Sequence, residues 1–192
     1  MKIGLYFGTF NPIHVGHLII ANHVVENSNL DEVWMVVTPH NPFKKKKTLL
    51  DNYQRYEMVY EATEDYPLLK PCDIEFGLPQ PSYTVNTLMH LKEKHPQHSF
   101  SLIMGEDNLQ SLHKWKNAEF LIEEYDIYVY PRVVENKQEV KVSCERIFFI
   151  DAPIVEISSS AIRSSLRTKK NIRPLLPQKV WEYVDKMNLY KK

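Results

Sequence analysis

The 192-residue sequence predicts an α/β fold of the Rossmann-like, doubly wound kind, a mainly parallel sheet with helices on both faces. Two observations lead to this prediction. Short apolar runs typical of buried strands alternate along the chain with segments of helical periodicity. No internal repeat or low-complexity linker interrupts the alternation, and the length suits one domain. We therefore expect a single domain over residues 1–192, with a helical C-terminal portion from about 157 to 192.

Several short apolar segments, bounded by polar or turn-forming residues, are predicted to be strands. In chain order they are KIGLYF at Lys2–Phe7, EVWMVVT at Glu32–Thr38, Leu69–Phe76, FSLIM at Phe100–Met104, Ile127–Tyr130 and Ile147–Ile150. Pro71 interrupts the third segment, because proline cannot donate a hydrogen bond to a sheet. Near-continuous apolar runs such as the first are typical of parallel strands buried between two layers of helices.

Helices are predicted where apolar residues recur at helical spacing or where a capping residue precedes such a segment. The expected helices are His14–Asn27, a segment capped by Asp51 that runs to about Thr63, a segment capped by Thr84 that runs to His95, a helix that opens at Ser159 or Ser160, and Gln178–Met187. The first three each lie between two predicted strands, which is the arrangement of β-α-β units.

Composition narrows the classes of function. Because 24 basic and 24 acidic side chains give a formal net charge of zero, no global field attracts nucleic acid, and an anion site has to be built locally. The sequence has no recognisable signal peptide or membrane-spanning run. Two isolated cysteines, Cys72 and Cys144, indicate reduced thiols. We expect a cytoplasmic protein that acts on small molecules without nucleic-acid or membrane partners, and a homo-oligomer stays open.

The stretch GTFNPIHVGH, Gly8 to His17, follows the first predicted strand and leads into the first predicted helix. In doubly wound folds, ligands bind outside the carboxyl ends of the strands. Gly8 is expected where the backbone turns tightly and stays open to a ligand. His14 and His17 are three residues apart and share one face of the first helical turns, where free amides attract phosphate. Gly16 allows a close approach to that surface. The stretch predicts a polyphosphate site.

Other interpretations of this stretch explain less of it. Paired histidines also occur in metal sites, but no third ligand lies nearby in the sequence. The chain has neither the GxxxxGK[ST] pattern of a Walker loop nor a GxGxxG fingerprint after the first strand. A histidine on a helix is often simply exposed, as we expect for His23.

A second motif, ISSSAIR at Ile157–Arg163, comes late in the chain at the start of a predicted helix. Serines at a helix start supply hydroxyls and amides for phosphate oxygens, and the guanidinium of Arg163 suits the geometry of phosphate. Alone, such a serine cluster is usually only a helix cap. Together with GTFNPIHVGH it becomes a specific signal.

The two motifs, HVGH at 14–17 and ISSSAIR at 157–163, together resemble the signatures of the HxGH nucleotidyltransferase superfamily. The wider pattern is similar to that of bacterial nicotinate-nucleotide adenylyltransferases, from about Ile3 to Tyr190. Further stretches that fit this family are NPFK at 41–44, PSYTVNTL at 81–88, MGEDNL at 104–109 and HKWKN at 113–117. The chain departs from the family at Phe43, where many relatives have histidine, at Asn11, a frequent aspartate, and at Ser160, a threonine.

The resemblance implies transfer of AMP from ATP to nicotinate mononucleotide, which gives nicotinate adenine dinucleotide and pyrophosphate in NAD biosynthesis. It implies His17, His14 and Arg163 as catalytic residues. The implied ATP site consists of Gly8, Thr9, Phe10, His14, His17, Asp107, Ile157, Ser158, Ser159 and Arg163. The implied acceptor site consists of Lys44, Tyr83, Thr84 and Trp115. Mg²⁺ is expected to arrive bound to the phosphates of ATP, with no metal site made of protein residues.

Alternatives stay open for several of these residues. Trp115 also fits a half-buried structural role, Thr84 a plain helix cap and Asp107 a turn. At the level of the whole protein, the alternatives are a related nucleotidyltransferase with nicotinamide mononucleotide or phosphopantetheine as acceptor, and a nucleotide-binding sensor without turnover. Amide donors that converge on the pyridine ring with no carboxylate nearby would favour the acid form of the acceptor over the amide form.

Overall fold

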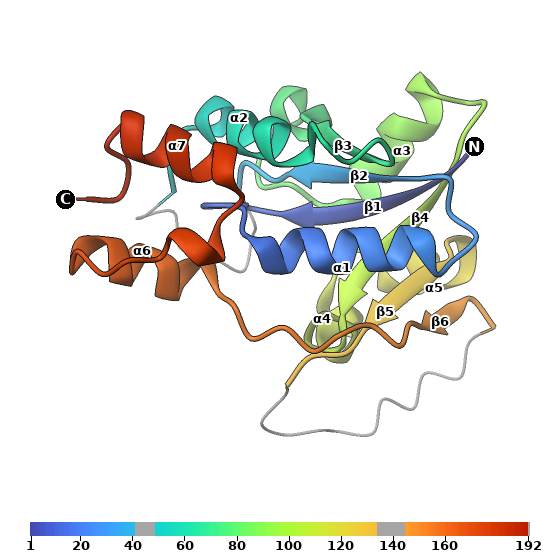
Figure 1. Ribbon diagram of the computed structural model, residues 1–192. Coiled ribbons are helices and arrows are strands. Elements are labelled where there is room, and N and C mark those ends of the chain that lie inside the picture. Colours follow the sequence, from blue (N-terminus) through green and yellow to red (C-terminus); the bar gives the residue numbers. More distant parts are fainter. Residues whose placement is uncertain (41–48, 134–144, 192) are drawn as a thin grey trace.

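The computed structural model describes residues 1–40, 49–133 and 145–191. Within these ranges, six parallel strands form one sheet in the order β3-β2-β1-β4-β5-β6 (Figure 1). The strand order reverses between β1 and β4, which makes the fold doubly wound and creates a crevice at the carboxyl ends of these two strands. The predicted Rossmann-like α/β class is confirmed.

The strands follow the predicted segments closely. They are β1 (Lys2–Gly8), β2 (Glu32–Val37), β3 (Leu69–Cys72), β4 (Ser99–Gly105), β5 (Ile127–Tyr130) and β6 (Ile147–Phe149). The helices are α1 (Val15–Glu26), α2 (Asn52–Thr63), α3 (Thr84–Lys94), α4 (Glu106–Ser111), α5 (Ala118–Glu124), α6 (Ser159–Arg167) and α7 (Gln178–Lys186). Short 3-10 turns are η2 (Ile74–Gly77), η3 (Leu112–Lys114) and η4 (Arg173–Leu175).

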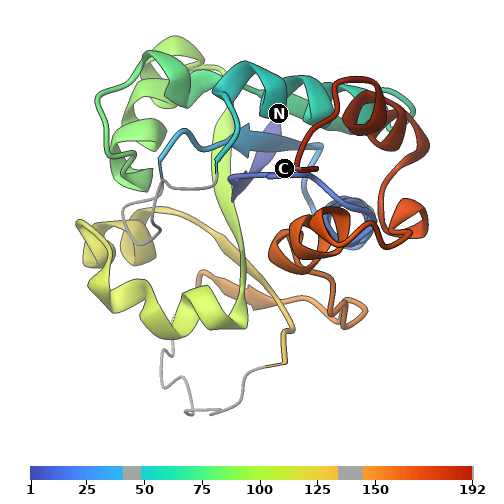
Figure 2. The same cartoon turned by 90° about the vertical axis from the view of Figure 1, so that its left-hand side faces the viewer.

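Each face of the sheet packs against its own layer of helices, because successive strand residues point to opposite faces. In β1, Leu5 belongs to a core shared with α3, α4 and α5, whereas Tyr6 belongs to a core shared with α1, α2, α6 and α7. In β4, Leu102 and Ile103 divide in the same way. Figure 2, which looks onto the carboxyl ends of the strands, shows the green and yellow-green α3 and α4 on one side and the orange and red α6 and α7 on the other.

The structure corrects two predicted elements and adds two helices. The third strand ends at Cys72 rather than Phe76, and η2 follows it. Thr84 is the first residue of α3, and Tyr83 occupies the cap position. The helices α4 and α5 had no counterpart in the prediction, because six and seven residues are too few to show helical periodicity.

Two predicted helix starts are confirmed. The side chain of Asp51 accepts a hydrogen bond from the N–H of Tyr53, 2.9 Å away, at the start of α2. At the start of α6, the hydroxyl of Ser158 accepts from the N–H of Ala161 at 3.2 Å. His23 is half-buried, so its predicted exposure is wrong.

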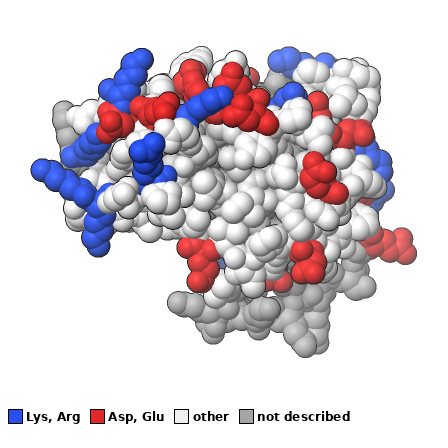
Figure 3. All heavy atoms as spheres, viewed as in Figure 1, with Lys and Arg blue, Asp and Glu red and all other residues white. Residues whose placement is uncertain are grey.

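The described surface carries mixed charge. Figure 3 shows Lys and Arg side chains gathered at the end of the molecule where α6 and α7 lie in Figure 1, with acidic side chains beside them. Among them, Lys179 of α7 pairs with Glu64 and Asp65 at 2.7 and 3.3 Å. In the described part of the chain, every helix is too short or too polar to cross a bilayer. Cys72 is a buried free thiol, whereas Cys144 lies outside the described residues.

Candidate active site

Two cavities meet at the carboxyl ends of β1 and β4, in the crevice that the reversal of strand order creates. We call them the histidine cavity, which His14, His17 and Arg163 line, and the tryptophan cavity, which Trp115 lines. Their common wall consists of Phe7, Ile103, Met104 and Asn108. Because both cavities border these four residues, two ligands bound in the cavities would lie next to each other there.

The histidine cavity collects most residues of the predicted ATP site from both ends of the chain. Its lining includes Gly8, Thr9, Phe10, His14, His17, Ile157, Ser158, Ser159 and Arg163. Asp107 differs, because it lines a smaller adjoining pocket next to Ile157 and Ser158. The described residues that line the histidine cavity include no carboxylate, which suits a polyanion.

Hydrogen bonds fasten the two sequence motifs to each other. The hydroxyl of Ser159 donates to the carbonyl of Pro12 at 2.9 Å. The guanidinium of Arg163 donates through Nη1 to the carbonyl of Asn11 at 2.7 Å and through Nη2 to the hydroxyl of Ser160 at 3.1 Å. The start of α6 is thus held against the β1–α1 loop. These contacts explain how residues 146 positions apart, such as His17 and Arg163, share one cavity.

His14 and His17 form a stacked pair at the start of α1. Their ring centroids are 3.7 Å apart with an interplanar angle of 21°. The backbone N–H of His14 donates to Nδ1 of His17 at 3.2 Å. Since Nδ1 accepts, the proton of a neutral His17 ring lies on Nε2. His17 therefore offers an N–H donor rather than a base on that nitrogen.

Burial determines the protonation state of His14, whose side chain is only 4% exposed. Burial, and secondarily the positive charge of Arg132, lowers the pKa of His14 to about 4. His14 is therefore neutral near pH 7. Its Nδ1 is buried without a hydrogen-bond partner among the described residues.

Two glycines make the loop geometry possible, in ways that differ from the prediction. Gly8 is the last residue of β1, and the left-handed residue of the loop is Phe10, with φ of 42°. A Cβ on Gly8 would lie 2.7 Å from the Phe10 ring, so Gly8 gives the ring its space. A Cβ on Gly16 would lie 2.9 Å from Cγ1 of Val155 and 3.1 Å from Nδ1 of His14. The group that approaches α1 at Gly16 is therefore the chain's own Val155.

A buried arginine ties together the strand ends below the histidine cavity. Arg55 of α2 is fully buried. Its guanidinium donates to the carbonyls of Thr9, Thr38 and Leu50 at 2.7, 2.8 and 3.1 Å. Burial lowers its pKa, although the guanidinium stays charged. Arg55 thus fixes the carboxyl ends of β1 and β2 relative to α2.

Asn11 connects this framework to the end of the chain. Its Oδ1 accepts from the hydroxyl of Tyr190 at 2.7 Å and from the N–H of Leu50 at 3.4 Å. Its carbonyl accepts from Arg163. The residue that departs from the family's frequent aspartate therefore supports the loop rather than facing a ligand alone.

Arg132 is a residue of the histidine cavity that the motif search missed. It lines the cavity just beyond β5 and pairs with Asp107 at 3.2 Å. A Cβ on Gly105 would lie 2.5 Å from Oδ1 of Asp107 and 2.8 Å from Cδ of Arg132, so this ion pair closes over Gly105. The position of Arg132, directly after a buried strand, is the signal that could have identified it.

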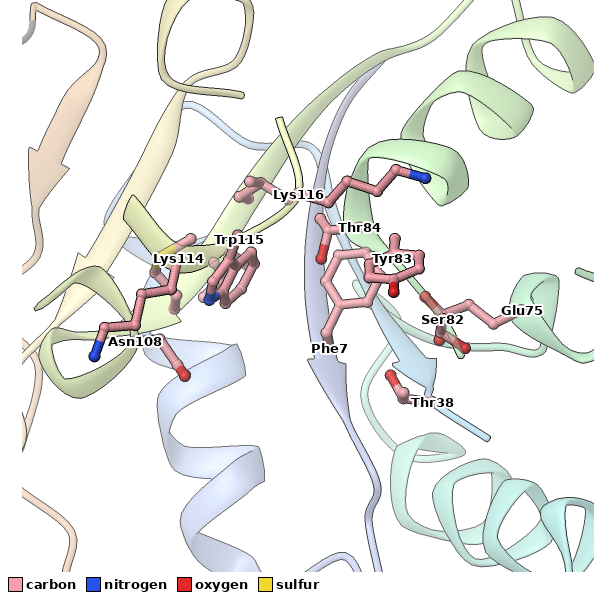
Figure 4. Close-up of a pocket in the computed structure, with 13 residues that line it drawn as sticks. Phe7, Thr38, Glu75, Ser82, Tyr83, Thr84, Asn108, Lys114, Trp115 and Lys116 are labelled. Atoms are coloured by element: carbon pink, nitrogen blue, oxygen red, sulfur yellow. The ribbon is translucent and has the colours of Figure 1, made fainter. Parts of the chain in front are cut away.

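The tryptophan cavity contains the described residues of the predicted acceptor site. Trp115, Tyr83 and Thr84 line it (Figure 4). Nζ of Lys116 lies 4.7 Å from the centroid of the Tyr83 ring. Thr84 begins α3, whose first amides have no partner within the helix. Lys44, the remaining predicted residue, lies outside the described residues.

Glu75 is the unexpected member of the tryptophan cavity. Figure 4 shows Glu75 and Ser82 on the side of the cavity opposite Trp115. Glu75 is 1% exposed and comes from η2, in a segment predicted as strand. The sequence offers no sign of its burial, because burial arises from the packing of η2 against β2 and α3. A carboxyl group therefore does stand near the predicted ring site.

The fold and the two cavities define a nucleotidyltransferase, and comparison with known proteins agrees. The model of the cytidylyltransferase-like family matches residues 5–165, and the chain belongs to this family. A relative from Flavobacterium johnsoniae, named "Probable nicotinate-nucleotide adenylyltransferase", is 68% identical over all of both chains. A relative of the same name from Christiangramia forsetii is 62% identical over 99% of this chain and 98% of its own. Within the wider class, the chain is therefore a member of the nicotinate-nucleotide adenylyltransferases.

A solved structure shares the fold at much lower identity. The nicotinic acid mononucleotide adenylyltransferase of Plasmodium falciparum, complexed with NaAD, superposes with a TM-score of 0.83 and 22% identity. The match covers 98% of this chain and 97% of that one. At this identity the likeness concerns the fold.

Proposed function

We propose that the chain transfers AMP from ATP to nicotinate mononucleotide, with ATP in the histidine cavity and the mononucleotide in the tryptophan cavity. The observation that carries this proposal is the union of HVGH and ISSSAIR in one cavity that shares a wall with a second, aromatic one. A phosphate oxygen of the mononucleotide attacks the α-phosphorus of ATP at this wall. A P–O bond forms to the acceptor, the bond to the β-phosphate oxygen breaks, and pyrophosphate leaves.

In this proposal, the triphosphate lies between the starts of α1 and α6. His17 donates from Nε2 to an oxygen whose negative charge grows as pyrophosphate departs. Arg163 and the hydroxyls of Ser158 and Ser159 hold the departing phosphates. Neutral His14 supports His17 through the stacked rings and adds no positive charge. Positioning and charge stabilisation account for such a transfer without a covalent enzyme intermediate.

The remaining residues of the ATP site follow from their positions. Gly8, Thr9 and Phe10 line the histidine cavity. Asp107 and Arg132 stand at the opening to the smaller adjoining pocket, where a ribose hydroxyl could donate to Asp107. The ion pair with Arg132 uses Oδ2 of Asp107, which leaves Oδ1 to accept from the ribose.

In the acceptor site, the pyridine ring stacks on Trp115, and the ring carboxylate meets the first amides of α3 at Thr84. Two solved neighbours are described as complexed with NaAD and with APC, which supports nucleotide ligands of this size in the shared fold. Mg²⁺ enters as part of the ATP complex. The imidazole, guanidinium and hydroxyl groups in the lining of the histidine cavity suit the phosphates rather than a cation, so the ion would be held through the phosphate oxygens of ATP and by water.

The test is to incubate the protein with ATP, Mg²⁺ and one acceptor at a time, and to measure pyrophosphate. Nicotinate mononucleotide is expected to give pyrophosphate and nicotinate adenine dinucleotide in equal amounts. Release with phosphopantetheine instead would indicate the related enzyme. Binding of ATP without pyrophosphate from any acceptor would indicate the sensor.

A further inference from the structure

Glu75 has the environment of a neutral carboxylic acid rather than of a carboxylate. Its Oε1 accepts a hydrogen bond from the hydroxyl of Thr87 at 2.7 Å. Thr38 and Ser82 line the same cavity. Among the described residues, no cation forms an ion pair with Glu75. A buried charge without a paired cation is costly, so the protonated form is favoured.

The second oxygen of Glu75 has an unmet capacity for hydrogen bonding. Oε2 is buried and has no hydrogen-bond partner among the described residues. A buried polar atom without a partner costs about 1–3 kcal/mol, and here the atom belongs to a side chain that lines a cavity. Opposite it stands Trp115 (Figure 4). A ring stacked on Trp115 would therefore lie in the cavity between Trp115 and the side where Glu75 lies.

Resting on the proposed function, we propose that Glu75 is a specificity-determining residue for the acceptor. Its Oε1 is the carbonyl oxygen that accepts from Thr87, and its Oε2 carries a proton that is donated to the carboxylate of the nicotinate ring. A hydrogen bond to an ionised acceptor is about twice as strong as one between neutral groups, so the contact favours the acid over the amide.

The charge state of Glu75 makes this preference depend on pH. Burial raises the pKa of Glu75, and the hydroxyls of Thr87, Thr38 and Ser82 only partly oppose the shift. When the group ionises, it repels the ring carboxylate and accepts from the N–H₂ of a ring amide. Preference for the acid form is therefore expected to fall as pH rises through this pKa.

Other ionisable groups lie near Glu75. Just before it in the chain, the Cys72 thiol is neutral, with a pKa that burial raises to about 12, and Asp73 lies two residues before Glu75. Tyr83, at the cap position before α3, lines the cavity, and so do Lys114 and Lys116 from the segment after α4. The charges of Lys114 and Lys116 also favour a ring carboxylate over a ring amide. Because both lysines are present in every Glu75 variant, a change in the ratio of kcat/KM for nicotinate and nicotinamide mononucleotides between variants isolates the contribution of Glu75.

Two variants with side chains close to Glu75 in size separate the effect of its charge from the effect of its hydrogen-bond donor. Glu75→Gln keeps an acceptor for Thr87 and an N–H donor toward the cavity, and it carries no charge at any pH. We expect it to keep the acid preference within about threefold and to lose its pH dependence. Glu75→Met removes the donor, and it is expected to lower the ratio about 10- to 100-fold at pH 7, mainly through KM of the nicotinate form.

A spectroscopic measurement on the unaltered protein keeps the proposal testable if Glu75→Met does not fold. Infrared difference spectra on adding nicotinate mononucleotide should show the C=O stretch of a protonated carboxyl shifting, and Glu75→Gln should lack this band. Absence of the band from the unaltered protein would overturn the proposal. So would equal losses for both acceptors in Glu75→Met. Failure of the proposed function looks different, because neither acceptor would then give pyrophosphate.

Discussion

The imidazole rings of His14 and His17 lie face to face with centroids 3.7 Å apart, and the N–H of His14 donates to Nδ1 of His17. The ring of His14 is buried and neutral. The ring of His17 has its proton on Nε2, because its Nδ1 accepts a hydrogen bond. One residue of the pair thus sets the orientation and tautomer of the other. This arrangement distinguishes the two histidines of the motif and leads to separate predictions for each.

Replacing His17 should affect catalysis far more than folding. Because His17→Ala removes a donor to the developing charge, kcat is expected to fall by about 100-fold or more, while the melting temperature changes little. His23→Ala, on the same helix but outside the histidine cavity, is the matched control and should keep kcat. If turnover survives in His17→Ala while the melting temperature collapses, the histidine is structural.

His14 should make stability depend on pH. Its pKa is lowered to about 4 in the folded protein from 6.5, so the unfolded chain binds more protons between these values. Stability is fully present above pH 6.5 and is lost as pH falls toward 4, by about 3 kcal/mol at most. Denaturant unfolding at pH 7 and 4.5 measures the loss. The variant His14→Asn, which cannot titrate, should lose less, and an equal loss in both proteins would refute this origin.

Arg163 should contribute mainly to the binding and transfer of phosphate. Arg163→Met removes a charged donor, and kcat/KM for ATP is expected to fall by about 10- to 100-fold. Arg167, one turn further along α6, is exposed, and Arg167→Met serves as the control. Steady-state kinetics with varied ATP distinguishes them. Equal effects of the two variants would mean that only the net charge of α6 matters.

Trp115 should affect the acceptor and not ATP. Loss of a stacking partner in Trp115→Ala is expected to raise KM for nicotinate mononucleotide by about three- to tenfold, whereas KM for ATP stays unchanged. Trp115→Phe keeps an aromatic face and should retain most of the affinity. A rise in KM for ATP in Trp115→Ala would mean that Trp115 contacts ATP rather than nicotinate mononucleotide.

The substitution Gly16→Ala should reduce catalytic activity more than it reduces the stability of the fold. At Gly16, the second residue of α1, alanine would gain up to about 1 kcal/mol because it restricts the unfolded chain, but its Cβ would lie 2.9 Å from Val155 and 3.1 Å from the His14 ring. Gly16→Ala is therefore expected to reduce kcat with little change in melting temperature. At Gly77 a Cβ meets nothing within 4 Å, so Gly77→Ala should leave kcat intact. Full activity of Gly16→Ala would show that the His14 ring does not depend on this packing.

Local patterns in the sequence are enough to predict the sheet and most helices. Apolar runs such as Lys2–Phe7 become strands because they are buried on both faces, and Asp51 begins α2 because its side chain satisfies a free amide. The motif residues His14, His17 and Arg163 could be recognised because the helix starts that carry them have their own sequence signals. The helices α4 and α5 could not be predicted from the sequence, because they are too short to show helical periodicity.

Sequence alone therefore determined the class of fold, the two motifs HVGH and ISSSAIR, and the family to which they belong. Only the tertiary structure decided which distant groups meet: Arg163 with the carbonyl of Asn11, Arg132 with Asp107, and Glu75 with the cavity of Trp115. The physical reason is that helices and strands arise from interactions between near neighbours in the chain. Burial, hydrogen bonding and protonation of a side chain depend instead on residues that only folding brings beside it.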